Sequence, residues 1–207
     1  MSPTPSPFNI IVVGVGGQGV VTLADTFWRA SAGRRWPCQG AILKGGAQQH
    51  GTVLAFLRIF PDGNPDYHRY SPEIPEGDLD LIVGLEPWEV LRQARFFGPR
   101  TRILTQSRPQ PFPTERFRAR AENVGDPVAE LGRLGRSLLA EDFAARAGAE
   151  LGSVRMAGYL LAASGVDAKL IPFEQSEIAE AYASAAKLGA GDRMRLQLRE
   201  QRQSVTL

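Results

Sequence analysis

Val13-Gly14-Val15-Gly16-Gly17-Gln18-Gly19-Val20 is the stretch that decides the fold, because a strand-like segment ends in it and a helix-like segment begins. The residues leading into it, Phe8 to Val15, are a short run rich in β-branched side chains. After it, from Gln18 to Ala32, apolar residues recur every three or four positions, as in an amphipathic helix. This order predicts a strand, a tight glycine turn and a helix.

The turn has the G-x-G-x-x-G spacing of a Rossmann-like first βα unit. Glycine lets the backbone turn sharply and approach a ligand, and the first N–H groups of the following helix favour an anion. A phosphate group could therefore bind at the glycine loop, which consists of Gly14, Gly16, Gly17, Gln18 and Gly19. The alternative is that these glycines only allow close packing of the strand on the helix.

Independent binding of NAD or FAD has less support. The dinucleotide fingerprint also needs an acidic residue about 20 positions further on, where it holds the ribose hydroxyls. Here the presumed second strand ends in Gln39-Gly40-Ala41-Ile42-Leu43-Lys44, which contains no carboxylate.

The rest of the chain alternates strand-like and helix-like segments. This order predicts a three-layer α/β/α domain with a mainly parallel sheet. Further strands are expected at Gly40 to Lys44, Thr52 to Phe60, Asp80 to Leu85 and Thr101 to Thr105. Helices are expected from Pro87 to Phe97, where Gly98-Pro99 ends an apolar stripe, and at Glu141 to Ala149, Ser153 to Ser164 and Glu174 to Lys187. Between Ser107 and Ser137 the pattern assigns no element.

We expect one domain over residues 8–190. Residues 1–7, rich in proline and serine, are expected to be disordered. Residues 191–207 form a polar, arginine-rich tail that suits either a frayed helix or docking on another chain. About the last fifteen residues are expected to stay unstructured.

Two further candidate sites lie at the carboxyl ends of strands, where open α/β sheets bind ligands. The segment Lys44 to Gly51 brings Lys44, Gln48, Gln49, His50 and Gly51 beside the glycine loop. Lys44 could hold a phosphate or carboxylate, but the same groups would equally serve a subunit contact. Glu86 follows the apolar strand, where it could act in catalysis or simply accept hydrogen bonds from loop amides.

The composition excludes several classes of protein. The 207 residues are 43% hydrophobic, enough for one sizeable core, and no apolar run approaches the roughly 20 residues that span a bilayer. We expect a cytoplasmic protein that binds neither a membrane nor nucleic acid. Cys38 is the only cysteine, and His50 and His68 lie far apart, so we expect no disulfide and no metal site in this chain.

The charge and the catalytic motifs are less informative. The formal net charge is +2, but arginines outnumber acids between Arg92 and Arg136. This excess could form a basic face for phosphate or an acidic partner, or only a solvated surface. No Ser–His–Asp set, carboxylate pair or P-loop stands out, so we expect no catalytic residue in this chain.

Several ordered blocks resemble the gamma subunit or domain of 2-oxoacid:ferredoxin oxidoreductases, which act on pyruvate, 2-oxoglutarate and indolepyruvate. The glycine loop is similar to that family's G-x-G-G-Q-G signature. Later segments of this chain resemble the family's later blocks in the same order. They are Lys44 to Val53, closed by Leu57-Arg58, then Pro75 to Asp80 and Leu85-Glu86-Pro87-Trp88-Glu89. Leu151 to Ala163 and Ile171-Pro172 fit the helical part. The resemblance is greatest to the indolepyruvate type, whose small beta subunit consists of this domain alone.

The resemblance implies a division of labour between subunits. A larger partner would carry thiamine diphosphate and iron–sulfur clusters and pass electrons to ferredoxin or another acceptor. This chain would hold none of these cofactors; it would complete the complex and contribute to a coenzyme A or substrate channel. The second loop departs from the family's M-S-Q-R-G-G form, because Gln49 replaces the arginine. Anion binding there would then need Lys44 or His50.

Three hypotheses follow from the sequence. The chain is a subunit of a thiamine-dependent 2-oxoacid oxidoreductase, a free-standing dinucleotide-binding redox module, or a non-catalytic scaffold. The sequence does not specify the 2-oxoacid, the electron acceptor or the stoichiometry.

Overall fold

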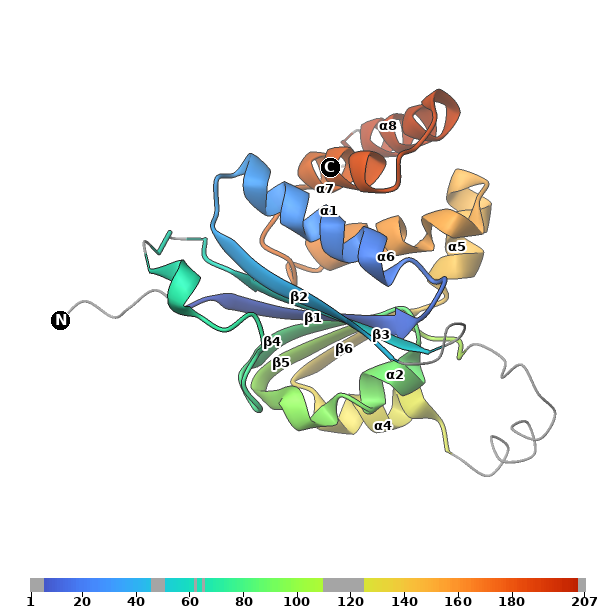
Figure 1. The fold of residues 1–207 in the computed structure, drawn as a ribbon. Coiled ribbons are helices and arrows are strands. Elements are labelled where there is room, and N and C mark those ends of the chain that lie inside the picture. The colour runs from blue at the N-terminus through green and yellow to red at the C-terminus, as the bar shows by residue number, and fades with distance from the viewer. Residues whose placement is uncertain (1–5, 46–50, 62, 65, 110–124, 205–207) are drawn as a thin grey trace.

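The computed structural model describes residues 6–45, 51–61, 63–64, 66–109 and 125–204. They form a six-stranded sheet covered by helices on both faces (Figure 1). The strands are β1 Phe8–Val15, β2 Cys38–Lys44, β3 Thr52–Ile59, β4 Leu79–Gly84, β5 Phe97–Gln106 and β6 Ser137–Glu141. The α-helices are α1 Val20–Gly33, α2 Pro87–Leu91, α4 Pro127–Leu134, α5 Phe143–Leu151, α6 Ala157–Asp167, α7 Gln175–Ala185 and α8 Ala190–Ser204. Short 3-10 helices lie at η1 Tyr67–Arg69, η2 Ala94–Phe96 and η3 Val154–Met156.

The strand order is β2-β3-β1-β4-β5-β6. Strands β1, β4, β5 and β6 are parallel neighbours, and β3 is antiparallel to both β1 and β2. The chain leaves β1 through α1, passes over the position of β3 to form β2, and returns as β3 between them. The predicted three-layer fold with a mainly parallel sheet is therefore confirmed, with one antiparallel strand inserted beside β1.

Strand β1 is the centre of the core, because its side chains alternate between the two faces of the sheet. Ile10 and Val12 pack into the larger cluster, with α1, α5, α6 and α7. Ile11 and Val13 pack into the smaller cluster, with α2 and α4 on the opposite face. All four side chains are fully buried, as a strand covered on both faces requires.

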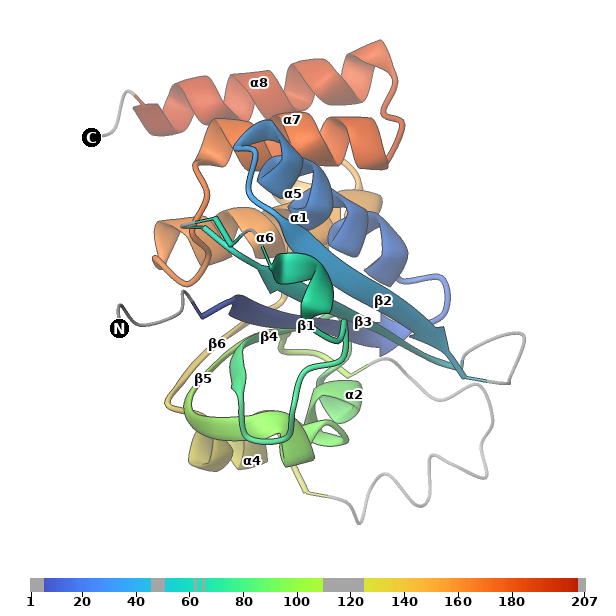
Figure 2. The ribbon, with the colours of Figure 1, turned by 60° about the vertical axis from the view of Figure 1, so that its left-hand side comes forward.

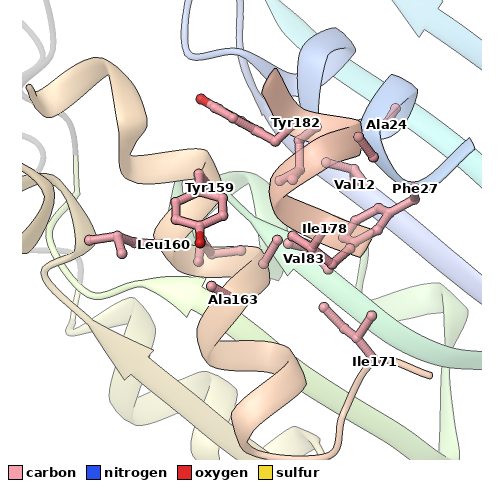
Figure 3. Close-up of a cluster of buried hydrophobic side chains, with 14 of the residues drawn as sticks. Val12, Ala24, Phe27, Val83, Tyr159, Leu160, Ala163, Ile171, Ile178 and Tyr182 are labelled. Carbon is pink, nitrogen blue, oxygen red and sulfur yellow. The ribbon is translucent and has the colours of Figure 1, made fainter. Parts of the chain in front are cut away.

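The larger cluster joins helices from distant parts of the chain. Figure 3 shows Phe27 of α1 and Ile178 of α7 against Val83 of β4, with Tyr159 of α6 beside them. Helix α6 is buried along nearly its whole length, as its almost continuous apolar sequence predicts. Helix α8 lies outside α7 (Figure 1). In the described residues no helix has the length and hydrophobicity needed to cross a membrane.

Several expectations for individual elements were wrong. The apolar stripe after Pro87 is not one helix: α2 ends at Leu91, η2 follows, and Gly98-Pro99 lies inside β5. No element was predicted between Ser107 and Ser137, yet α4 lies there and β6 begins at Ser137. The tail is helical as far as Ser204, because burial of Leu196 anchors α8. The first five residues lie outside the described part, and the domain limits stay a prediction.

Candidate functional site

The glycine loop joins β1 to α1 in a conformation that explains three of its glycines. Gly17 and Gly19 have φ angles of 96° and 95°, a left-handed region that side chains disfavour. Gly14 is required for a different reason, because a Cβ there would lie 2.7 Å from Gln18 Oε1 and 3.0 Å from Leu85 Cβ. These glycines therefore serve the turn and the packing, whatever the loop binds.

Gln18 holds the loop closed. Its Oε1 accepts a hydrogen bond from the Val15 N–H at 2.8 Å, which ties the start of α1 back to the end of β1. Helix α1 then begins after Gly19 without a side-chain cap and without an acidic residue in its first turn. Its first N–H groups are therefore not covered by a carboxylate of α1 itself, and an anion is electrostatically favoured there.

The second loop ends beside the first. The Gly16 N–H donates to the Gly51 carbonyl at 2.9 Å, and Thr52 at the start of β3 pairs with Val15. Lys44 is exposed at the carboxyl end of β2, two strands away from β1. Gln48, Gln49 and His50 lie outside the described residues.

Glu86 and Glu89 have structural roles at the start of α2. Glu86 is the N-cap residue, and its Oε2 accepts the Glu89 N–H at 2.9 Å. The Glu89 carboxylate accepts hydrogen bonds from Thr52 Oγ1 and from Arg92. Both side chains are buried. This arrangement accounts for Glu86 as a cap, and it ties α2 to the strand that follows the second loop.

A cleft of about 700 Å³ opens at the carboxyl edge of the sheet. Its inner wall consists of Gly17, Gln18, Gly19 and Thr22 together with Leu85 after β4. The remaining lining comes mainly from η3 and the start of α6, and from the connection between α7 and α8. The volume lies within the range that small-molecule and cofactor sites occupy. The glycine loop therefore lines a cleft that is large enough for a small-molecule ligand.

Two cationic side chains in this cleft could not be predicted from the sequence. Arg155 on η3 and Lys187 after α7 line the same cleft as the glycine loop, together with one acidic residue, Asp192, and both cations are exposed. They lie more than 130 residues from the loop in sequence, and only the packing of α6 and α7 on α1 brings them near it. The sequence carries only a local sign of them, since Gly152 and Gly189 mark the connections near which Arg155 and Lys187 lie.

The described residues contain no group of three or more His, Cys, Asp or Glu side chains that could hold a metal ion. Cys38, on the edge strand β2, is mostly buried, and this burial raises the pKa of its thiol to about 12. A thiol with that pKa is protonated near neutral pH and is a weak nucleophile.

The family comparison covers nearly the whole chain. A family model described as pyruvate ferredoxin/flavodoxin oxidoreductase matches residues 9–188. Among curated proteins, the chain is 38% identical over 100 residues to indolepyruvate oxidoreductase subunit IorB of Archaeoglobus fulgidus, covering 48% of this chain and 46% of that one. It is 32% identical over 104 residues to IorB of Thermococcus kodakarensis, covering 50% and 48%. The chain thus spans about half the length of the curated relatives it matches.

Solved structures with the same fold have low sequence identity. Pyruvate oxidoreductase subunit PORC from Thermotoga maritima has a TM-score of 0.59 at 14% identity, covering 92% of this chain and 90% of that one. The gamma subunit of the Geobacter sulfurreducens keto/oxoacid ferredoxin oxidoreductase has a TM-score of 0.57 at 14% identity, covering 92% and 94%. A 2-oxoglutarate:ferredoxin oxidoreductase from Magnetococcus marinus has a TM-score of 0.62 at 13% identity, covering 96% of this chain and 31% of that one. At these identities the likeness shows the fold alone.

Proposed function

Because the chain belongs to the pyruvate ferredoxin/flavodoxin oxidoreductase family, we propose that it is a gamma-type subunit that works with a larger partner in oxidising a 2-oxoacid. The match over residues 9–188 carries this proposal, since it includes the glycine loop and most of the residues that line the cleft. The reaction is an oxidative decarboxylation whose electrons pass to ferredoxin or another acceptor. The protein would act in the cytoplasm.

An aryl-pyruvate such as indolepyruvate is the proposed substrate. The supporting observation is that the curated relatives are indolepyruvate oxidoreductase subunits, at 32% and 38% identity over about half of their length. In the proposed complex, bound thiamine diphosphate would activate the 2-oxoacid and iron–sulfur clusters would carry its electrons. The larger partner would hold both, as the family resemblance implies, and the single cysteine of this chain, Cys38, agrees with that for the clusters.

The cleft is the proposed place for coenzyme A or the substrate channel. One neighbour of similar fold was solved with 2-oxoglutarate, coenzyme A and succinyl-CoA bound. In this chain the first N–H groups of α1 would meet a phosphate group, and Arg155 and Lys187, which line the same cleft, would add positive charge. Gly16, Gly17 and Gly19 would allow close approach of the ligand. Lys44, Gln48, Gln49, His50 and Gly51 would line the same edge or contact the partner, and Glu86 would support it as the cap of α2.

The test is co-expression with a thiamine- and cluster-bearing large subunit, followed by assays of 2-oxoacid-dependent acceptor reduction. We expect turnover by the complex and none by the isolated chain. Gly16→Val should lower kcat/KM of the complex by about tenfold or more, equivalent to about 1.4 kcal/mol, because its side chain would obstruct the loop. Gln48→Ala should also lower it. Gly33→Ala, at the far end of α1 with no atom near the added Cβ, is the matched control.

Each competing hypothesis has its own outcome. Oxidation of a 2-oxoacid by the isolated chain would contradict the proposal. Nucleotide retained by the isolated chain through purification would favour a free-standing dinucleotide-binding module. Normal turnover of a stable complex after changes in both loops would favour a scaffold.

A further inference from the structure

The outer edge of β2 is open for pairing. Strand β2 is the first strand in the sheet, and within the described residues no strand pairs with its outer side (Figure 2). It runs for seven residues in unbroken register with β3, from Cys38 opposite Ile59 to Lys44 opposite Val53. Proteins usually protect such an edge with proline, a bulge or inward-pointing charge. Here the strand has none of these, and Lys44 at its end is its only charge.

The ends of the β2–β3 ladder reveal which backbone groups point outward. The Gly45 N–H donates to the Thr52 carbonyl, and the Pro37 carbonyl accepts from the Phe60 N–H. Odd-numbered residues of this segment therefore point their backbone groups toward β3. Because these groups alternate along an antiparallel strand, the N–H and C=O groups of Cys38, Gly40, Ile42 and Lys44 point away from the sheet.

An apolar groove runs along this edge, between β2 and α1. It has a volume of about 290 Å³. Its lining comes from α1, including Val21, Asp25 and Trp28, from Ile42 of β2 and from residues 55–57 of β3. Val21, Trp28 and Ile42 are 42%, 41% and 40% exposed. The Trp28 ring lies over Gly40, where an added Cβ would meet it at 3.1 Å. The open backbone edge and the exposed apolar side chains thus form one continuous surface.

This surface is complementary to itself. If two copies of β2 pair antiparallel about a twofold axis at Ala41, the midpoint of the strand, Gly40 of each copy lies opposite Ile42 of the other. Both residues carry outward-pointing backbone groups, so each pair can exchange two hydrogen bonds. Ile42 of one copy then lies beside Gly40 of the other and next to the Trp28 ring that covers that glycine. Lys44 lies opposite the neutral Cys38, so no like charges meet.

We propose that a second copy of this chain occupies the edge, joining two six-stranded sheets through β2 in one continuous sheet. The inference does not rest on the proposed function, and it holds for the chain whatever reaction the complex performs. Self-pairing is favoured over another occupant because a single register pairs all seven residues, brings the exposed Ile42 of each copy beside Gly40 and Trp28 of the other, and places no like charges opposite each other.

Cysteine cross-linking tests the register. In a Cys38→Ala background, the two copies of Ala41→Cys would have Cα atoms about 4.5 Å apart, as a non-hydrogen-bonded antiparallel pair, within reach of a disulfide. The two copies of Leu43→Cys would lie four positions apart, about 14 Å, beyond reach. We expect a covalent dimer on mild oxidation for Ala41→Cys and none for Leu43→Cys, measured on non-reducing gels.

Removal of a backbone donor tests the pairing itself. Ile42→Pro deletes an outward N–H while leaving the β2–β3 hydrogen bonds in place, and Ile42→Lys puts a charge on the edge if proline proves too disruptive. We expect the unmodified chain to be dimeric by light scattering, and both variants to show at least a tenfold weaker dimer with an unchanged far-UV spectrum. Leu198→Lys, at an exposed apolar position on α8, should leave the dimer intact.

Three results would overturn the proposal. The first is an unmodified chain that is monomeric. If Ile42→Pro then also abolished binding of the large partner, the partner and not a second copy would occupy the edge. The second is a dimer that survives both Ile42 substitutions. The third is cross-linking of Leu43→Cys at the rate of Ala41→Cys, because that would show a different register.

Discussion

The glycine at position 14 has a role that its place in a motif does not reveal. Its Cα packs against Gln18, Leu85 and Val20, so that an added Cβ would lie 3.0 Å or less from all three side chains. Gly17 has open space around it but a φ of 96°. The two glycines are therefore needed for different reasons, the first for close packing against Gln18, Val20 and Leu85, and the second for the turn.

These reasons lead to different costs of substitution. Gly14→Ala should lower the free energy of unfolding by about 1–3 kcal/mol through overpacking, and Gly17→Ala by about 1–2 kcal/mol through backbone strain. Gly33→Ala should not destabilise the fold, because its Cβ meets no atom within 4 Å and its φ is ordinary. Urea denaturation checks all three. A Gly14→Ala variant as stable as Gly33→Ala would mean that β1, α1 and the end of β4 are loosely packed.

Other residues in the segments that resemble the family also have structural roles. Arg58, which closes the second block of the resemblance, is buried and donates from Nε to Asn9 Oδ1 at 3.0 Å. Asn9 in turn donates to Asp78, and its backbone N–H donates to Asp80. This network joins β1, β3 and β4 at the amino edge of the sheet, far from the cleft. Buried polar groups of this kind must be satisfied together, which accounts for several motif residues at once.

Among the elements, α8 depends on a charged contact as well as an apolar one. Arg199 is buried, lies with its guanidinium carbon 5.6 Å from the Tyr159 ring centroid, and donates to Glu150 of α5 at 3.2 Å. Arg146 also donates to Glu150, at 2.6 Å. Burial alone would raise the pKa of Glu150, but hydrogen bonds and charge attraction from Arg146 and Arg199 outweigh it and lower the pKa.

The sign of this shift predicts how stability varies with pH. A carboxylate whose pKa is lower in the folded state stabilises the fold above its unfolded pKa, and this contribution is lost as pH falls through the folded pKa. The free energy of unfolding should therefore fall below about pH 4.3, and less steeply in Glu150→Gln. Urea denaturation between pH 7 and pH 3 tests this. Parallel curves for the two proteins would show that α8 does not depend on the ionised carboxylate.

The sequence predicts elements well where the pattern is long and periodic. Strand β1 and helices α1 and α7 were located to within a few residues, because their apolar positions repeat at a clear spacing. Helix α2 was predicted too long, because Val90, Leu91, Ala94 and Phe97 recur at helical spacing although α2 ends at Leu91 and Phe97 begins β5. Strand β6 is five residues with no fully buried side chain, so neither a continuous apolar run nor strict alternation marks it. Only part of the cleft was predicted. The glycine loop was identified from its motif, whereas the residues of η3, α6 and the α7–α8 connection reach the cleft through tertiary packing.

For the molecule as a whole, the position of β3 matters for what the glycine loop can bind. In a dinucleotide-binding fold the second strand lies directly beside the first, so that a carboxylate at its end reaches the ribose. Here β3 occupies that position, and the end of β2 is two strand spacings from β1, about 9.5 Å.

A substitution can test whether this spacing matters. Lys44→Asp puts an acidic side chain at the end of β2, the second strand along the chain, 25 positions after Gly19 (44 − 19). We expect neither the unmodified chain nor this variant to bind NAD in isothermal titration, because the carboxylate would be one strand too far away. Micromolar binding gained by Lys44→Asp would contradict this.

A fingerprint counts residues along the chain, whereas a bound nucleotide spans strands across the sheet. With one strand inserted between them, two positions that share a sequence interval with the dinucleotide fold no longer share a binding site. The glycine turn can then remain while the ribose contact is lost. A match to the sequence spacing alone would indicate a dinucleotide that this strand order does not allow the chain to hold by its ribose.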